Sequence, residues 1–205
     1  MEISQHEPNN NSLNDSLSLF ERANLAASSK GLKELLESTL SLFSELCNAR
    51  SGMFFVYQAA DNHLHLRLGM GQIPAPESLR DQPLPPHALG WQAIQQKQPI
   101  LHTLQAGETW QADLEALNGL PKSNILGVPF LAGESPAGVL LLIDCQTAQL
   151  EQVRWLSARL ANDIYRAIRL EDTERLAERM QAMVAIFEQI GSTLDRDQLL
   201  RTMIE

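Results

Sequence analysis

The chain has 205 residues, of which 44% are hydrophobic and 20% are charged, and its formal net charge is −9. This length allows one sizeable domain with extensions, and the composition is that of a soluble globular protein. The negative charge disfavours nucleic acids and anionic membrane surfaces as partners, because both would be repelled. No stretch approaches the roughly 20 apolar residues that cross a bilayer. The polar start MEISQHEPNNN also lacks a signal-peptide core, so we expect a cytoplasmic protein.

The first part of the chain predicts a leader and two helices. Residues 1–14 are polar and rich in asparagine, so we expect them to be disordered. Helical spacing begins near Asp15 and is interrupted at residues 28–31 (SSKG). A strongly amphipathic helix follows, with residues three and four apart at Leu32, Leu35, Leu36, Thr39, Leu40, Phe43, Leu46 and Cys47. Gly52 is expected to cap this helix or turn the chain after it.

The middle of the chain predicts short strands separated by loops. Residues 53–57 (MFFVY) favour a strand. Residues 63–68 alternate, so a second antiparallel strand should place Leu64, Leu66 and Leu68 on one face. Five prolines and two glycines fall within residues 69–86, which predicts a mobile loop. Later apolar patterns predict a helix over 87–97, a strand over 99–102 and a helical turn over 112–117.

Residues 124–145, NILGVPFLAGESPAGVLLLIDC, predict a β-hairpin around which the rest of the domain packs. The sequence GESP at 133–136 is dense in turn-forming residues. Residues 139–143 (VLLLI) are an apolar run too short for a helix, so we expect a central strand that is buried on both faces. Pro129 lacks a backbone donor and therefore predicts a bulge or an edge position.

The last part of the chain predicts a long helix. Apolar residues recur with a helical period from Gln149 to Leu170, and the register slips around 171–175. The next set has the four-three spacing of a coiled-coil seam, which predicts a connecting helix over 171–190: Leu176, Met180, Met183, Phe187 and Ile190. Residues 190–204 echo residues 26–40. Either any two amphipathic helices share this much, or residues 191–205 begin a second copy of the domain.

From about Leu17 to Leu170 the chain resembles a GAF domain, the small-molecule sensor module of many signalling proteins, and we expect residues 15–170 to form this domain. Four stretches in order carry the resemblance: LKELLESTLSLFSELCNARSGMFFVY, LGWQAIQQKQPILH, the ILGVPF and AGVLLL hairpin, and the long last helix. The resemblance implies an α+β fold with a central antiparallel sheet of about five or six strands. The helices that begin and end the domain would cover one face, and pocket helices and loops the other. It also implies a homodimer formed through those terminal helices.

The sequence carries no pattern that is typical of an enzyme, so we expect a domain without catalytic activity. His63 and His65 are spaced as two metal ligands could be, but no third ligand stands near them, and a polar surface role is the simpler interpretation. Cys47 and Cys145 are expected to be buried structural thiols. Neither cysteine matches the positions used by GAF-type free methionine sulfoxide reductases or by bilin-binding GAF domains.

The resemblance implies a ligand pocket between the sheet and residues 87–120. Trp91 and Trp110 would lie over it, whereas Phe55 and Phe130 are expected in the core. The candidate ligand-binding residues are Tyr57, His87, Trp91, His102, Trp110, Asp113 and Asn124. The ligand and any cofactor stay unknown. We expect a regulatory sensor domain that binds a small molecule and relays the signal through a dimeric helix bundle. The alternative is a ligand-free dimerisation and relay module.

Overall fold

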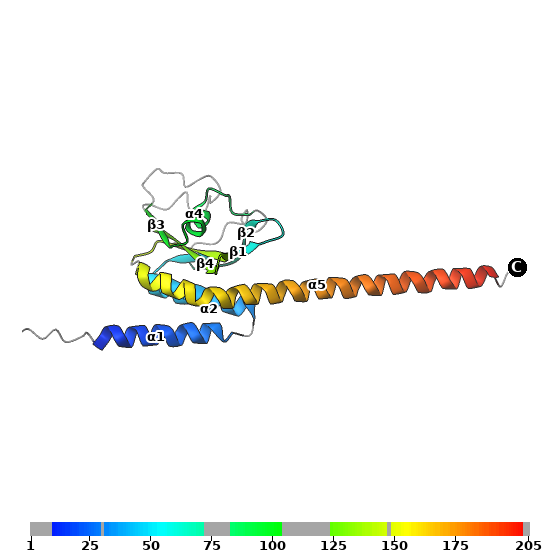
Figure 1. Ribbon diagram of the computed structural model, residues 1–205, viewed down its shortest axis with the longest axis horizontal. Coiled ribbons are helices and arrows are strands. Elements are labelled where there is room, and N and C mark those ends of the chain that lie inside the picture. Colours follow the sequence, from blue (N-terminus) through cyan, green and yellow to red (C-terminus); the bar gives the residue numbers. More distant parts are fainter. Residues whose placement is uncertain (1–9, 30, 72–82, 104–123, 147–148, 203–205) are drawn as a thin grey trace, which may run out of the picture. The chain divides into compact units, whose positions relative to one another are not determined.

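The computed structural model describes residues 10–29, 31–71, 83–103, 124–146 and 149–202. The helices are α1 (Asn10–Ala27), α2 (Leu32–Cys47), α4 (Leu89–Gln96) and α5 (Leu150–Thr202) (Figure 1). The strands are β1 (Ser51–Gln58), β2 (His63–Gly71), β3 (Ile100–Thr103), β4 (Asn124–Ala132) and β5 (Ser135–Ile143). The chain divides into two compact units, residues 1–165 and residues 166–205. Among the described residues, no helix has the length and hydrophobicity that a membrane span requires.

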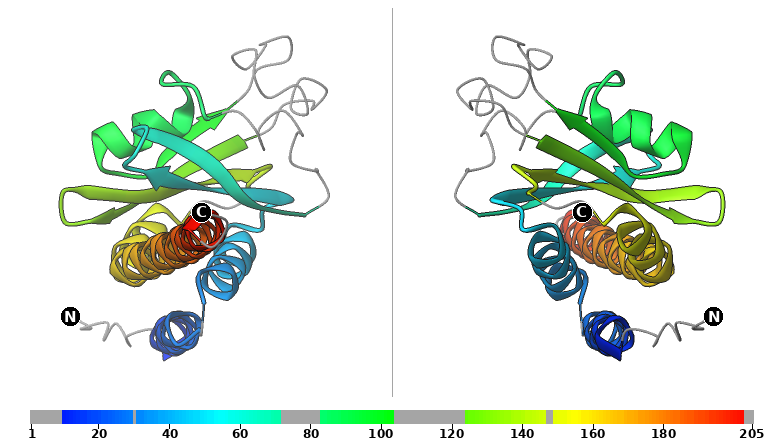
Figure 2. Two further views of the ribbon diagram at one scale, coloured as in Figure 1. Left: turned by 90° about the vertical axis from the view of Figure 1, so that its right-hand side faces the viewer. Right: turned by 90° about the vertical axis from the view of Figure 1, so that its left-hand side faces the viewer.

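The five strands form one antiparallel sheet in the order β2-β1-β5-β4-β3. The predicted central strand is confirmed, since β5 lies in the middle and its side chains from Val139 to Ile143 are fully buried. Figure 2 shows α4 on one face of the sheet, and α2 with the first part of α5 on the other. The predicted α+β architecture is therefore present, with a core on each side of β5.

The turn after α2 differs from the prediction. The helix ends at Asn48, whose backbone is left-handed (φ 46°, ψ 48°) and whose N–H contacts the carbonyls of Glu45 and Ser44. Asparagine adopts this conformation at modest cost, so it can cap a helix in place of glycine. The cap predicted at Gly52 is wrong. Gly52 lies within β1, where an added Cβ would come within 3.1 Å of Leu142 Cδ2.

The pairing of β1 with β2 contains a bulge that the sequence did not indicate. Phe54 pairs with Leu68, but the next residue, Phe55, pairs with Leu66, so the alternation shifts by one residue. Paired residues share a face, and Phe54 and Phe55 point to opposite faces. The prediction that Leu68 shares a face with Leu66 is therefore wrong.

The predicted hairpin of β4 and β5 is present with a tighter turn than expected. Ala132 pairs with Ser135, so the turn has two central residues, and the first, Gly133, has φ 65°. A positive φ at that position suits glycine and matches the twist of the strands. Pro129 lies beyond Gly127, the last β4 residue that β3 pairs, so it occupies an edge stretch as predicted.

A hydrophobic cluster fills the space between the sheet and α4, and we call it the α4-face core. Its buried members are Met53, Phe55, Leu64, Leu84, Ala88, Leu89, Ala93, Ile125, Val139, Leu141 and Ile143. Leu84 is notable because it belongs to the segment predicted as one mobile loop. Its side chain is fully buried and its N–H donates to the Leu64 carbonyl at 2.7 Å. Gly69 and Gly71 also belong to β2, whereas residues 72–82 lie outside the described part.

The opposite face is covered by aromatic and leucine side chains under the helices. Phe43 of α2 and Phe54 of β1 both contact the Phe130 ring, with centroid distances of 5.6 and 5.1 Å. Phe55 and Phe130 are thus core residues, as predicted. In the same unit, Arg159 of α5 donates to the Asn24 side chain of α1 at 3.1 Å. The first and last helices of this unit are therefore joined by a polar contact as well as by packing.

The start of α1 differs from the prediction, whereas α5 is the long helix that the sequence predicts. Helix α1 begins at Asn10, inside the segment expected to be a disordered leader and before the predicted start near Asp15. Helix α5 is continuous from Leu150 to Thr202, so the slip in register at 171–175 does not interrupt it. The second domain copy proposed for residues 191–205 stays a prediction.

Candidate functional site

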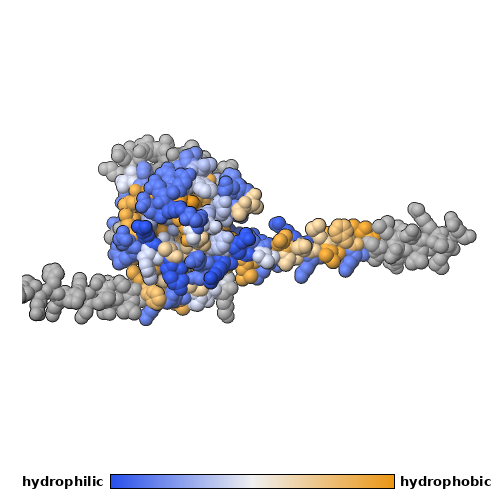
Figure 3. All heavy atoms as spheres, in the orientation of Figure 1, coloured by the Kyte–Doolittle hydropathy of each residue, from blue (hydrophilic) through white to orange (hydrophobic). Residues whose placement is uncertain are grey.

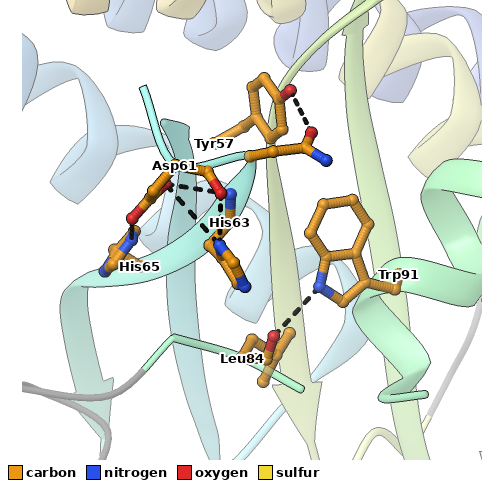
Figure 4. Close-up of polar contacts among 7 residues, drawn as sticks. Tyr57, Asp61, His63, His65, Leu84 and Trp91 are labelled. Carbon is orange, nitrogen blue, oxygen red and sulfur yellow. Dashed lines mark hydrogen bonds and ion pairs between the residues drawn. The ribbon is translucent and has the colours of Figure 1, made fainter. Parts of the chain in front are cut away.

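Tyr57 and Trp91 meet at the edge of the α4-face core (Figure 4). Tyr57 extends from β1 and Trp91 from α4, and their rings lie edge to face with centroids 6.3 Å apart. The Trp91 Nε1–H donates to the Leu84 carbonyl at 3.1 Å. Strand β1 and the segment that runs from Leu84 into α4 therefore converge on one half-buried aromatic pair.

The polar groups of this aromatic pair already have partners inside the chain. The Tyr57 hydroxyl donates to Asn62 Oδ1 at 2.6 Å, and Asn62 holds a left-handed turn conformation with φ 61°. The Trp91 indole has one donor, which Leu84 occupies. A ligand at this rim would therefore meet the ring faces and the acceptor lone pairs of the tyrosine oxygen.

Beside Tyr57, the turn between β1 and β2 carries a small network of Asp61, His63 and His65 (Figure 4). Asp61 Oδ2 lies 2.6 Å from His65 Nε2, and Asp61 Oδ1 accepts from the His63 backbone N–H at 3.1 Å. Desolvation raises the pKa of Asp61, but these hydrogen bonds and the imidazole charges outweigh it and hold that pKa below its ordinary value. Within the described residues, no group of three or more His, Cys, Asp or Glu side chains is arranged to hold a metal ion.

Directly between α4 and the sheet, the protein's own side chains fill the space. A Cβ added at Gly90 of α4 would lie 2.9 Å from both Leu84 Cδ2 and Val139 Cγ1. A Cβ added at Gly127 of β4 would lie 3.2 Å from Leu89 Cγ. Both glycines therefore permit a close approach of helix and sheet. In this part of the described structure, a ligand could contact the rim but not the centre of the contact.

In the described part of the chain, the other candidate residues do not lie beside Tyr57 and Trp91. His102 pairs with Ile125 and shares the α4 face, whereas the neighbouring Asn124 belongs to the opposite face. Asn124 accepts from Thr103 Oγ1 at 2.8 Å and donates to the Cys145 carbonyl at 3.3 Å, so it fixes strand ends.

None of the remaining three candidates is shown beside Tyr57 and Trp91. His87 is exposed, and its carbonyl accepts from the Gln92 side chain at 3.1 Å. Trp110 and Asp113 fall outside the described residues.

A groove of about 400 Å³ on the helical side of the domain was not predicted from the sequence. Its lining comes from α1, α2 and the end of β2: Arg22, Leu25, Ala26, Glu37, Ser38, Ser41, Leu42 and Met70. Arg22 forms an ion pair with Glu45, which also accepts from Ser41 Oγ. The helical periods of α1 and α2 are visible in the sequence, but the position of Met70 depends on strand register and could not be read from it.

Comparisons with known proteins agree with this fold. The GAF domain family model matches residues 31–168. Among solved structures, the GAF domain of an Acinetobacter phosphoenolpyruvate-protein phosphotransferase has a TM-score of 0.59 at 19% identity, covering 79% of this chain and 97% of that one. The corresponding Coxiella burnetii domain has a TM-score of 0.56 at 14% identity, with coverage of 77% and 94%.

A third similar structure is free methionine-R-sulfoxide reductase from Neisseria meningitidis in complex with its substrate. Its TM-score is 0.57 at 13% identity, and the match covers 82% of this chain and 98% of that one. A search of curated protein sequences finds no match. Identities this low establish the shared fold alone, but the family model spans more than half of the residues. The chain belongs to the GAF domain family.

Proposed function

We propose that this chain is the regulatory sensor domain of a cytoplasmic signalling protein, in which a small molecule acts on the domain and a pair of α5 helices carries the change onward. GAF domains are sensor and regulatory modules of signalling proteins. The observation that carries the proposal is an apolar stripe along the second unit of the chain.

The α5 stripe consists of Leu176, Met180, Met183, Phe187 and Ile190. These side chains have exposed fractions between 50% and 65%. Figure 3 shows hydrophobic residues, in orange, on the surface of α5. Surfaces of this kind normally mark a contact with a partner. The four-three spacing suits a second copy in parallel, because each side chain then enters a space between four residues of the other helix.

The charges along this helix also suit self-association. Residues 166–190 contain four Arg and five Asp or Glu, so this segment is nearly neutral although the whole chain carries −9. Glu171 and Arg175 form an ion pair one turn apart within the same helix. Two copies aligned side by side would therefore meet little electrostatic repulsion.

The ligand-binding step has weaker support and one alternative. The Tyr57–Trp91 rim supplies half-buried aromatic faces, which are frequent in small-molecule sites. The packing at Gly90 instead favours a module that relays a signal without a ligand, because the space under α4 is already filled there. Native mass spectrometry of the purified chain separates the two. A co-purifying mass that is lost on unfolding supports the sensor, and the bare chain mass alone supports the relay module.

Sedimentation equilibrium of the full chain tests the paired helices. We expect a dimer that Phe187→Glu weakens at least about tenfold, because the change places a charge in the seam. Gln181→Glu is the matched control, since it adds the same charge to the same helix outside the stripe. A chain that is monomeric without any substitution, or equal weakening by both variants, would reject the proposal.

A further inference from the structure

The α5 stripe overlaps with a second row of mainly apolar residues on the same helix, which we call the early row because it begins sooner. Its members follow the same alternation of three and four residues: Leu170, Thr173, Ala177, Met180, Val184 and Phe187. All of these side chains are exposed, and the exposed fractions of Leu170 and Val184 are 60% and 55%. The Thr173 hydroxyl donates to the Arg169 carbonyl at 2.7 Å, so this residue can enter an apolar contact without leaving its hydroxyl unpaired.

The two rows share Met180 and Phe187 but lie on different sides of them. In a coiled coil, seven residues make two turns, so successive residues are about 103° apart around the helix. Met183 lies between the two shared residues in the α5 stripe, and Val184 lies between them in the early row. The centres of the two rows are therefore about 50° apart on the helix surface. A partner helix can be centred on only one row at a time.

Each row stays partly covered when a partner helix is centred on the other. When the early row is central, the large residues of the α5 stripe flank it, and when the α5 stripe is central, Ala177 and Val184 flank it. Flanking side chains of a coiled coil still pack beside the seam. Met180 is unbranched and flexible, so it can fill either contact. The ion pair of Glu171 with Arg175 lies outside both rows, so a change of row leaves it intact.

We propose that a pair of parallel α5 helices exchanges between two contacts, one centred on the α5 stripe and one on the early row, by a rotation of each helix of about 50°. The partner is a second copy of this chain, so the inference rests on the proposed function and specifies the change that would be passed onward. Packed contacts switch between discrete arrangements and do not deform continuously. Helix α5 is continuous through both rows, so a rotation that begins before Leu170 would reach Ile190.

Disulfides between two copies of the full chain, each with one added cysteine, report which row is central. In a parallel dimer, the same residue of both copies meets its counterpart only where it lies in the seam. Leu176→Cys therefore reports the α5 stripe, and Ala177→Cys reports the early row. Glu178→Cys is the matched control, because residue 178 lies outside both rows. The native Cys47 and Cys145 are buried, and the unsubstituted chain measures any contribution from them.

Two charge substitutions then bias the exchange in opposite directions. Met183→Glu places a carboxylate in the seam of the α5 stripe only, and Val184→Glu places one in the seam of the early row only. In oxidised glutathione, we expect the cysteines at 176 and 177 both to cross-link faster than the cysteine at 178. Because a buried charge disfavours the seam that holds it, Met183→Glu should lower the ratio of the rate at 176 to the rate at 177 at least about tenfold. Val184→Glu should raise the same ratio.

The outcomes separate this inference from the proposed function. Opposite shifts of the ratio by Met183→Glu and Val184→Glu would support both. Cross-linking at only one of the two reporting positions, or a ratio that neither charge substitution shifts, would overturn the exchange and leave the paired helices standing. An unsubstituted chain that is monomeric in sedimentation, with no cross-link at any added cysteine, would reject the proposed function and the exchange with it.

Discussion

Helix α5 contains two stretches of apolar residues with opposite surroundings. In the first unit, Val153, Leu156, Leu160 and Ile164 are all fully buried. In the second unit, the α5 stripe is at least half exposed throughout. The helical period is clear in both stretches, and the helix is continuous. An apolar period therefore predicts that a helix forms, but it does not say whether the same domain or another chain covers it.

The largest expected effect comes from breaking the buried stretch. Leu156→Glu would place an unpaired charge in the core and should cost more than about 4 kcal/mol, enough to unfold the domain. Thermal unfolding followed by tryptophan fluorescence measures this, since all three tryptophans precede residue 166. A soluble variant with an unchanged melting temperature would mean that Leu156 is not in the core.

A smaller effect should come from the other side of the sheet. Gly90→Ala adds a Cβ 2.9 Å from Val139 Cγ1, and this β-branched side chain in the central strand has little freedom to move. We expect a loss of about 1–3 kcal/mol in denaturant unfolding. Gly31→Ala is the matched control, because nothing lies within 4 Å of an added Cβ there. Equal stability of the two variants would show that α4 packs less closely than described.

Exposed polar contacts of the first unit should contribute less than either packing change. The folded-state pKa of Asp61 lies below its ordinary value of 3.8, so ionised Asp61 stabilises the fold above that pH, and this contribution is lost as pH falls through the folded pKa. Asp61→Asn removes the titration. The variant should therefore lose less stability than the unmodified chain between about pH 5 and pH 2. Identical acid unfolding curves would contradict the network with His63 and His65.

The smallest effect on the domain should come from the exposed stretch. Phe187→Glu makes the same kind of change as Leu156→Glu on the same helix, yet it should alter the stability of the first unit by less than about 0.5 kcal/mol at low protein concentration. The same fluorescence measurement applies. A large drop in melting temperature would mean that the first unit depends on the stripe for its own stability.

Much of the fold could be predicted because its signals are local. The run VLLLI identified the central strand, and GVPF with AGVL identified the hairpin, since each element carries its own pattern and turn. The bulge at Phe54 and Phe55 and the burial of Leu84 could not be predicted. Both depend on what lies across the strand or under α4, and neither has a signature in its own segment.

The candidate site was harder to predict than the fold. Tyr57 and Trp91 were both chosen from the sequence, and the structure brings their rings together. Asn124 was chosen as a polar group that could line the pocket, but a polar residue at a strand end can turn to either face. Here its hydrogen bonds to Thr103 and Cys145 direct it away from the α4 face. Side-chain direction at an element end follows from tertiary partners, which one sequence does not name.

The sheet order has a consequence for how the protein is made. Strand β5 is the last in sequence but pairs with β1, so that Ser51 meets Ile143. A ribosome therefore releases the β1–β2 hairpin long before the strand that completes its other edge. Until β5 emerges, the apolar faces of β1 have no sheet to join, and contacts between such distant residues form slowly. The growing chain should consequently keep one edge of β1 unpaired through most of the domain's synthesis, and the final hairpin should commit it to fold.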